Sequence, residues 1–141
     1  MRWILIDSLN DIVSFEVSAG RKRFASVGSE MIFKAEPVKL LGVPETYIQY
    51  RWTFGDGTSA QGSIISHRYK FPGEYVVVLN ATYGDKSAVS RTTVEIIDPV
   101  FVIEPVPGGI KVINQSPGEV NVGEWVIEGA RTRFEMPRDT I

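Results

Sequence analysis

The sequence predicts an all-β fold, a sandwich of strands. Several short runs alternate apolar and polar residues, and this period of two is typical of half-buried strands. Turn signals rich in glycine and proline recur at roughly the 8–12-residue spacing of all-β sandwiches. No window shows the roughly 3.6-residue periodicity of a long amphipathic helix. The 141 residues suffice for one ordinary domain, or for one small domain and part of another.

The first strands are expected at residues 12–18 and 31–35, each with alternate side chains facing inward. A basic turn is expected at 19–22, and residues 37–44, which contain two prolines and Gly42, are expected to form a loop. The inward side chains of the two strands are predicted to be Val13, Phe15, Val17, Met31, Phe33 and Ala35.

The most informative run covers residues 47–58 and indicates a strand that ends in a tight turn. Gly55-Asp56-Gly57 supplies the turn, because glycine tolerates positive φ and aspartate can bond its own backbone. Before the turn, one face of the strand holds Ile48, Tyr50, Trp52 and Phe54, and the other holds Gln49, Arg51 and Thr53.

Further strands follow this turn. A short return strand is expected at 61–66, and Pro72-Gly73 marks a second turn. Residues 74–83 and 88–97 then predict two long strands joined by a hairpin turn at 83–86. Their inward side chains are predicted to be Tyr75, Val77, Leu79, Val94 and Ile96.

Two breaks divide the rest of the chain. Asp98-Pro99 ends the last long strand, and a cluster of proline and glycine at 105–109 makes the second break. The expected organisation is an N-terminal segment at 1–11, a sandwich domain at 12–98, a Pro/Gly linker at 99–108 and a β-rich unit at 109–141.

Composition excludes several classes of function. The net charge of −2 gives no electrostatic case for a nucleic acid or an anionic membrane as partner. The absence of cysteine excludes disulfides and cysteine-ligated metals. The apolar start of the chain is too short for a signal-peptide core or a membrane span, so any targeting segment is expected to be missing from this chain.

The ordered motifs of residues 50–79 resemble those of the PKD (polycystic kidney disease) domain. That family has an aromatic-x-Trp-x-Phe-Gly-Asp-Gly run, then His-x-Tyr, then Pro-Gly-x-Tyr-x-Val-x-Leu. The resemblance covers about residues 13–97 and departs at Thr53, where the family usually has Asp or Asn. The matching residues are Tyr50, Trp52, Phe54, Gly55, Asp56, Gly57, His67, Tyr69, Gly73 and Tyr75.

The resemblance implies an immunoglobulin-like β-sandwich that is usually extracellular and often repeated. It implies a spacer or interaction module that is not itself catalytic, although such domains often accompany enzymes. The matching residues are then expected to have structural roles.

From about Gly109 the chain is similar to the start of a lamin-tail domain, on the runs 109–114, 119–127 and 134–141. It departs at Glu124 and Asp139, where that family commonly has glycine. The chain is expected to end inside this second domain, and the pair of domains resembles bacterial surface proteins. Its apolar side chains are expected to pack on the first domain or to pair with a neighbouring chain. These side chains are Val120, Val122, Trp125, Ile127 and Phe134.

Asp56 admits two interpretations. We favour one in which it closes the turn by bonding backbone amides. The other makes it a metal or substrate carboxylate. Calcium needs several converging oxygen ligands, so a calcium site would require Asp56, Asp85 and Asp98 to meet in space.

His67, the only histidine, is expected to be structural and to lie next to the strand that bears Trp52, as the resemblance implies. A general base would need a nucleophile and an orienting carboxylate. Ser63 and Ser66 are near in sequence, but no nucleophile-elbow pattern is present. No catalytic residue, cofactor or metal is predicted.

Aromatic side chains offer a second candidate surface, a sugar-stacking platform. Trp52 belongs to the predicted core, so Tyr47 and Phe71 are the better candidates for exposed, ligand-facing aromatics. The cluster 21–23 is expected to be a solvated basic turn. Two triplets fit the N-glycosylation pattern, at Asn80, on the outward face of its strand, and at Asn114.

We therefore expect a non-enzymatic cell-surface or secreted module for spacing, adhesion or protein–protein interaction. The alternative is a carbohydrate- or polymer-binding accessory module of a secreted enzyme. A row of exposed aromatics would favour the alternative, and a flat polar surface would favour the first function. A hydrolase in its own right lacks a nucleophile–base constellation.

Overall fold

The computed structural model describes residues 14–120, 122–129, 131 and 133–138. The expected N-terminal segment at 1–11, the side chain of Val13 and the last three residues lie outside the described residues. Within the described ranges there is no α-helix, and no helix is long and apolar enough to cross a membrane. The elements are β1 (Ser14–Ser18), β2 (Arg23–Ser26), β3 (Met31–Lys34), β4 (Glu36–Leu41), the 3₁₀-helix η2 (Glu45–Tyr47), β5 (Gln49–Thr53), β6 (Ser59–Gln61), β7 (Ile64–His67), β8 (Gly73–Tyr83), β9 (Lys86–Ile97), β10 (Phe101–Val106), β11 (Gly109–Asn114), β12 (Val126–Glu128) and β13 (Arg133–Glu135).

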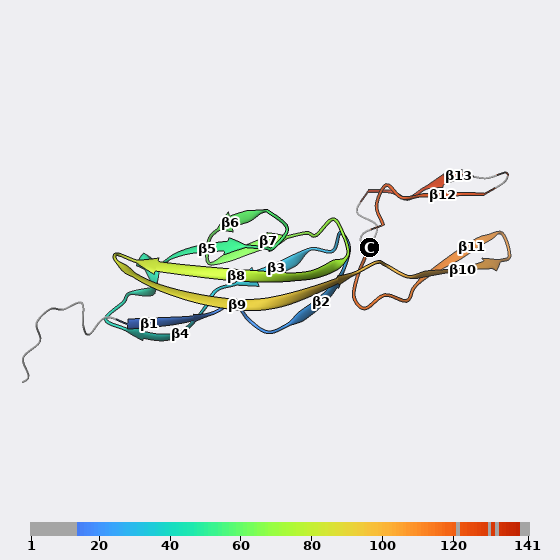
Figure 1. Ribbon diagram of the computed structural model, residues 1–141. Coiled ribbons are helices and arrows are strands. Elements are labelled where there is room, and N and C mark those ends of the chain that lie inside the picture. The colour runs from blue at the N-terminus through green and yellow to red at the C-terminus, as the bar shows by residue number, and fades with distance from the viewer. Residues whose placement is uncertain (1–13, 121, 130, 132, 139–141) are drawn as a thin grey trace, which may run out of the picture. The chain divides into compact units, whose positions relative to one another are not determined.

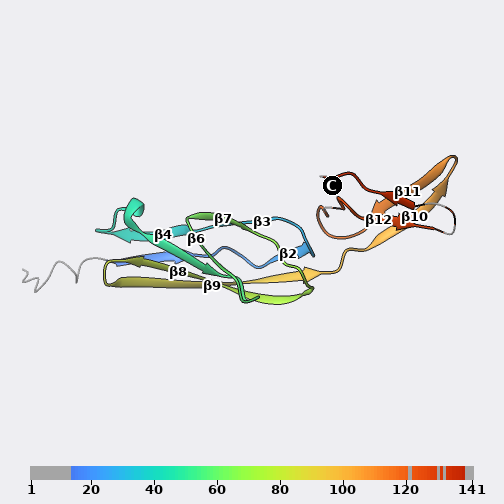
Figure 2. The ribbon, with the colours of Figure 1, turned by 90° about the horizontal axis from the view of Figure 1, so that it is seen from above.

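The main sheet has five strands in the order β2-β9-β8-β5-β6. Its longest strands, β8 and β9, contain 11 and 12 residues and lie side by side (Figure 1; Figure 2). β5 pairs antiparallel with β8 and with β6, so that Trp52 lies opposite both Leu79 and Ala60. The pairs β1-β4 and β3-β7 form two further small sheets. The predicted all-β, immunoglobulin-like sandwich is confirmed.

Aromatic rings pack between the main sheet and the β3-β7 sheet. In β5, Tyr50 and Trp52 are buried, as are Ile48 and Phe54 on either side of the strand. The ring centroid of Phe33, in β3, lies 5.7 Å from that of Trp52 and 5.4 Å from that of Phe54. The other predicted inward residues found buried are Phe15, Val17, Met31, Ala35, Val77, Leu79, Val94 and Ile96.

The prediction of a loop at 37–44 is wrong over most of that range, because Glu36–Leu41 form β4. This strand pairs antiparallel with β1. A proline is tolerated because the register shifts between Glu16 and Val17, and Val17 lies opposite Pro37 next to this irregularity.

The prediction of a solvated basic turn at 21–23 is wrong for Arg23, because this residue begins β2. Its guanidinium carbon lies 4.2 Å from the ring centroid of Phe33. Its Nη1 also donates a 2.7 Å hydrogen bond to the carbonyl of Ile32. The long side chain therefore covers an aromatic ring of the core and keeps its charge bound to a backbone acceptor.

The return strand expected at 61–66 is two strands that belong to different sheets. β6 pairs with β5, whereas β7 pairs with β3. The chain changes sheet at Gly62, which has a φ of 135°.

Contacts divide the chain into two compact units that interleave in sequence. Of the described residues, the first unit holds 14–23, Ile32–His67 and Tyr75–Val94, and the second holds Phe24–Met31, Arg68–Glu74 and those from Glu95 onward. In the second unit, β10 and β11 form a hairpin, as do β12 and β13. The residues expected as a linker at 99–108 therefore include β10.

Candidate functional site

The turn after β5 is held in shape by its own backbone. Gly55 and Gly57 both have positive φ, 80° and 88°, and the amide of Phe54 donates to the carbonyl of Thr58 at 3.2 Å. A Cβ on Gly55 would lie only 2.8 Å from the carbonyl oxygen of Val76, whereas one on Gly57 would meet nothing within 4 Å. The first glycine is thus required by both conformation and space, and the second by conformation alone.

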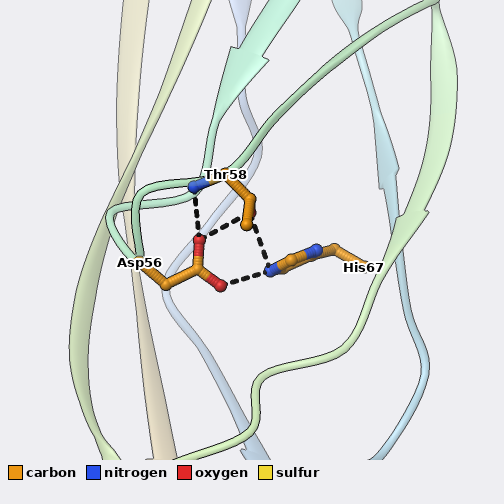
Figure 3. Close-up of polar contacts among 3 residues, drawn as sticks. All are labelled: Asp56, Thr58 and His67. Atoms are coloured by element: carbon orange, nitrogen blue, oxygen red, sulfur yellow. Dashed lines mark hydrogen bonds and ion pairs between the residues drawn. The ribbon is translucent and has the colours of Figure 1, made fainter.

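The carboxylate of Asp56 connects this turn to His67 of β7 (Figure 3). Its Oδ1 accepts hydrogen bonds from the amide of Thr58 at 3.0 Å and from the Thr58 hydroxyl at 2.6 Å. Its Oδ2 lies 2.7 Å from Nε2 of His67. Both carboxylate oxygens therefore have hydrogen-bond partners. One of these partners is the backbone amide of Thr58, the kind of donor that the turn-closing interpretation requires.

The balance of these contacts sets the acidity of Asp56. Burial by itself would raise the pKa of the carboxyl group. The hydrogen bonds from the Thr58 side chain, from His67 and from the Thr58 backbone, with the attraction of His67, outweigh it and hold the pKa below its usual value. The ionised carboxylate is therefore the form that the fold stabilises.

His67 is also fixed by ring stacking. Its imidazole lies nearly parallel to Phe54, with ring centroids 4.0 Å apart and 10° between the planes. The side chain is only 14% exposed. Because Phe54 directly follows β5, which bears Trp52, this stacking sets His67 next to the end of that strand.

The three polar side chains do not have the geometry of a nucleophilic triad. In such a triad the carboxylate binds one ring nitrogen and the nucleophile faces the other. Here Asp56 Oδ2 and Thr58 Oγ1 both face Nε2, at 2.7 and 3.5 Å. The Thr58 hydroxyl also lies 2.6 Å from Asp56 Oδ1. The polar atoms of Asp56, Thr58 and His67 therefore face one another.

The remaining motif residues lie mostly in the interior. Trp52 is fully buried, and its Nε1 donates a 3.0 Å hydrogen bond to the carbonyl of Gly62. Tyr69 is also fully buried, Tyr75 is half-buried and Gly73 is exposed at the start of β8.

Tyr50 is buried, and its hydroxyl has no hydrogen-bond partner within the described residues. Burial raises the pKa of this hydroxyl, and the negative charge of Glu45 raises it further.

The carboxylates considered for calcium do not converge. Asp85 lies in the turn between β8 and β9, and Asp98 follows the other end of β9. A strand of 12 residues spans roughly 40 Å, so these two carboxylates cannot share one ion. Among the described residues, no group of three or more His, Asp or Glu side chains is placed to hold a metal.

The candidate ligand-facing aromatics are both exposed, Tyr47 in η2 by 70% and Phe71 before β8 by 71%. Asn80 is half-buried on the outward side of β8. Asn114 is engaged locally, because its amide donates to the carbonyl of Gly118 at 3.0 Å and its Oδ1 accepts from the amide of Ser116 at 2.8 Å.

Sequence reasoning missed a polar groove of about 880 Å³ that lies over β5, β6, β8 and η2. We call it the β5–β8 groove. The signal was present in the alternation, which placed Gln49 and Arg51 on the outward face of β5. The pairing of these residues with β8 and β6 could not be inferred locally. The polar side chains that line the groove are Glu45, Thr46, Gln49, Arg51, Gln61, Ser63, Asn80 and Thr82.

A smaller, apolar hollow of about 300 Å³ lies in the second unit, between the β10-β11 and β12-β13 hairpins. The rings of Phe101 and Trp125 meet there edge to face, with centroids 5.3 Å apart. Of the tail residues expected to need a cover, Val120 is buried, whereas Trp125 and Phe134 are exposed.

Comparison of the chain with known protein families identifies one matching family. The model of the PKD domain matches residues 14–96. The solution structure of the PKD domain from human KIAA0319 is 17% identical, with a TM-score of 0.49, and the match covers 64% of this chain and 89% of that one. The PKD domain from the human VPS10 domain-containing receptor SorCS2 is 24% identical, with a TM-score of 0.43, and the match covers 62% of this chain and 72% of that one. No curated protein matches the chain.

Proposed function

The chain belongs to the PKD domain family over residues 14–96, and from this membership we propose that it is a non-enzymatic module for spacing, adhesion or protein–protein interaction. We place it outside the cell, at the surface or secreted, since modules of this family are typically extracellular. Its partner is then another protein of that compartment.

One observation carries the non-enzymatic part of the proposal. The polar side chains of the family motif are occupied with one another in the turn after β5. Asp56 binds Thr58 and His67, and His67 stacks on Phe54. A general base must instead point its free ring nitrogen at a nucleophile or a substrate.

The strand architecture supports a mechanical or spacing role. β8 and β9 contain 11 and 12 residues and are adjacent in the main sheet. Their long ladder and the fully buried Trp52 between the sheets make a stiff unit. Variable loops at the strand ends are then free to carry recognition.

The proposal is tested by measuring turnover and binding on the same preparation. We expect no hydrolysis of ester, peptide or glycoside substrates, and saturable binding to an extracellular protein on an array of purified domains. Hydrolysis that disappears in both His67→Ala and Thr58→Ala, with the amide spectrum of each variant still dispersed, would overturn the proposal.

A second function, carbohydrate binding as an accessory module, is favoured by the β5–β8 groove. Its lining consists mainly of amide, hydroxyl and charged side chains. These groups suit a hydroxyl-rich ligand better than an apolar one.

For residues 109–141 we propose a lamin-tail-like unit in a bacterial surface protein, supported by the resemblance of the runs 109–114, 119–127 and 134–141 to that family. Its exposed Trp125 and Phe134 are then covered by pairing with a neighbouring chain. Light scattering of the purified chain tests this arrangement, because a concentration-independent monomer would contradict it.

A further inference from the structure

The β5–β8 groove brings outward-facing side chains of three paired strands together. Arg51 of β5 lies opposite Asn80 of β8 on one side and opposite Gln61 of β6 on the other. Gln49 lies opposite Thr82 in the same ladder. Since their neighbours in sequence face the core, these five side chains share the outer face of the sheet.

The polar side chains of this groove are uncommitted. Within the described part of the chain, no hydrogen bond or ion pair is made by the side chains of Glu45, Gln49, Arg51, Gln61, Asn80 or Thr82. Their donors and acceptors are therefore available to a ligand, in contrast to the occupied side chains of the Asp56 turn.

The mixture of groups indicates the chemistry of that ligand. A carboxylate only accepts hydrogen bonds, a guanidinium only donates them, and side-chain amides do both. The groove holds one Glu and one Arg among its lining residues, so its formal charges balance. A neutral ligand whose hydroxyls each donate and accept would match all of these groups.

One exposed aromatic residue adjoins the groove in sequence. Tyr47 does not itself line the groove, but it follows the lining residues Glu45 and Thr46 in η2 and is exposed, so a sugar that extends past the groove could stack on its ring.

We propose that the β5–β8 groove binds a neutral oligosaccharide, with Tyr47 stacking on a sugar ring that extends past the groove. This inference rests on the second of the two functions proposed above, carbohydrate binding, and assigns that function to a site. Arg51, Asn80 and Gln61 hold the sugar hydroxyls across the three strands.

The test is a nuclear magnetic resonance titration of the isotope-labelled full chain with four neutral hexasaccharides: cellohexaose, chitohexaose, maltohexaose and mannohexaose. We expect at least one to shift the backbone amides of Arg51, Asn80 and Thr82. Tyr47→Ala and Asn80→Ala should each weaken binding about tenfold, the effect of losing one good contact. Phe71→Ala, which removes an equally exposed aromatic elsewhere, should leave it unchanged.

The outcomes separate the site from the function. Sugar-induced shifts near Phe71, with affinity unaffected by Tyr47→Ala and Asn80→Ala, would overturn the groove while leaving carbohydrate binding standing. No shift with any hexasaccharide at millimolar concentration would overturn both. Shifts at Ser59–Gln61 produced by an extended peptide and by no sugar would assign the groove to a protein partner through the β6 edge and would also overturn the proposal.

Discussion

Nε2 of His67 lies 2.7 Å from Oδ2 of Asp56, and this contact joins two sheets of the sandwich. Asp56 belongs to the turn after β5, in the main sheet, whereas His67 ends β7, which pairs with β3. Since the other carboxylate oxygen accepts two hydrogen bonds from Thr58, one side chain both closes the turn and anchors it to the second sheet.

Replacing this carboxylate should weaken the fold. Asp56→Ala removes three polar contacts, and we expect the free energy of unfolding to fall by about 1–3 kcal/mol. Urea denaturation monitored by circular dichroism measures the change. Asp98→Ala, at an exposed position directly after β9, is the matched control and should stay within about 0.5 kcal/mol of the parent. Equal losses in the two variants would contradict the role of Asp56.

The contribution of Asp56 should depend on pH with a definite sign. Its pKa in the folded protein is held below the ordinary value of 3.8, so folding favours the ionised form. The resulting stabilisation is complete above that ordinary pKa and is lost as the pH falls through the lower, folded-state pKa. We therefore expect the stability difference between the parent and Asp56→Asn to be constant near neutrality and to shrink below about pH 4. Urea midpoints measured from neutral to acidic pH test this, and a difference that grows on acidification would contradict it.

The core could be predicted from sequence because its signal is local. Alternation in residues 49–53 assigns Tyr50 and Trp52 to one face, and the same rule places Phe33 inward in β3. Their meeting across the sandwich then follows from burial, since a sheet must cover its apolar face with another layer.

β4 and the Asp56–His67 contact could not be predicted, because both depend on partners distant in sequence. β4 contains Pro37 and has mostly exposed side chains, so only its pairing with β1 makes it a strand. Asp56 and His67 are 11 residues apart, and they meet because the chain changes sheet at Gly62. No periodicity within residues 56–67 encodes that change.

Gly55 and Gly57 should differ in their tolerance of a side chain. Gly57→Ala has open space and introduces mainly left-handed strain, which costs about 1–2 kcal/mol. Gly55→Ala has a comparable φ and also brings its Cβ to 2.8 Å from the Val76 carbonyl oxygen, so the backbone must move. We expect it to cost at least about 1 kcal/mol more than Gly57→Ala. Parallel urea titrations of the two variants compare them, and equal costs would mean that the approach of β8 to the turn is easily relaxed.

The same substitution should destabilise the protein much more at one of the two described tryptophans than at the other. Trp52 is fully buried, and its Nε1 donates to the carbonyl of Gly62. Trp52→Phe leaves a cavity and removes the donor to this carbonyl, and we expect it to lower the free energy of unfolding by roughly 2–4 kcal/mol. Trp125 is 43% exposed, so Trp125→Phe should change stability by less than about 1 kcal/mol. Thermal and urea unfolding of both variants provide the comparison. A larger loss in Trp125→Phe would mean that the fold depends more on the second unit than on the ring cluster of Phe33, Trp52 and Phe54.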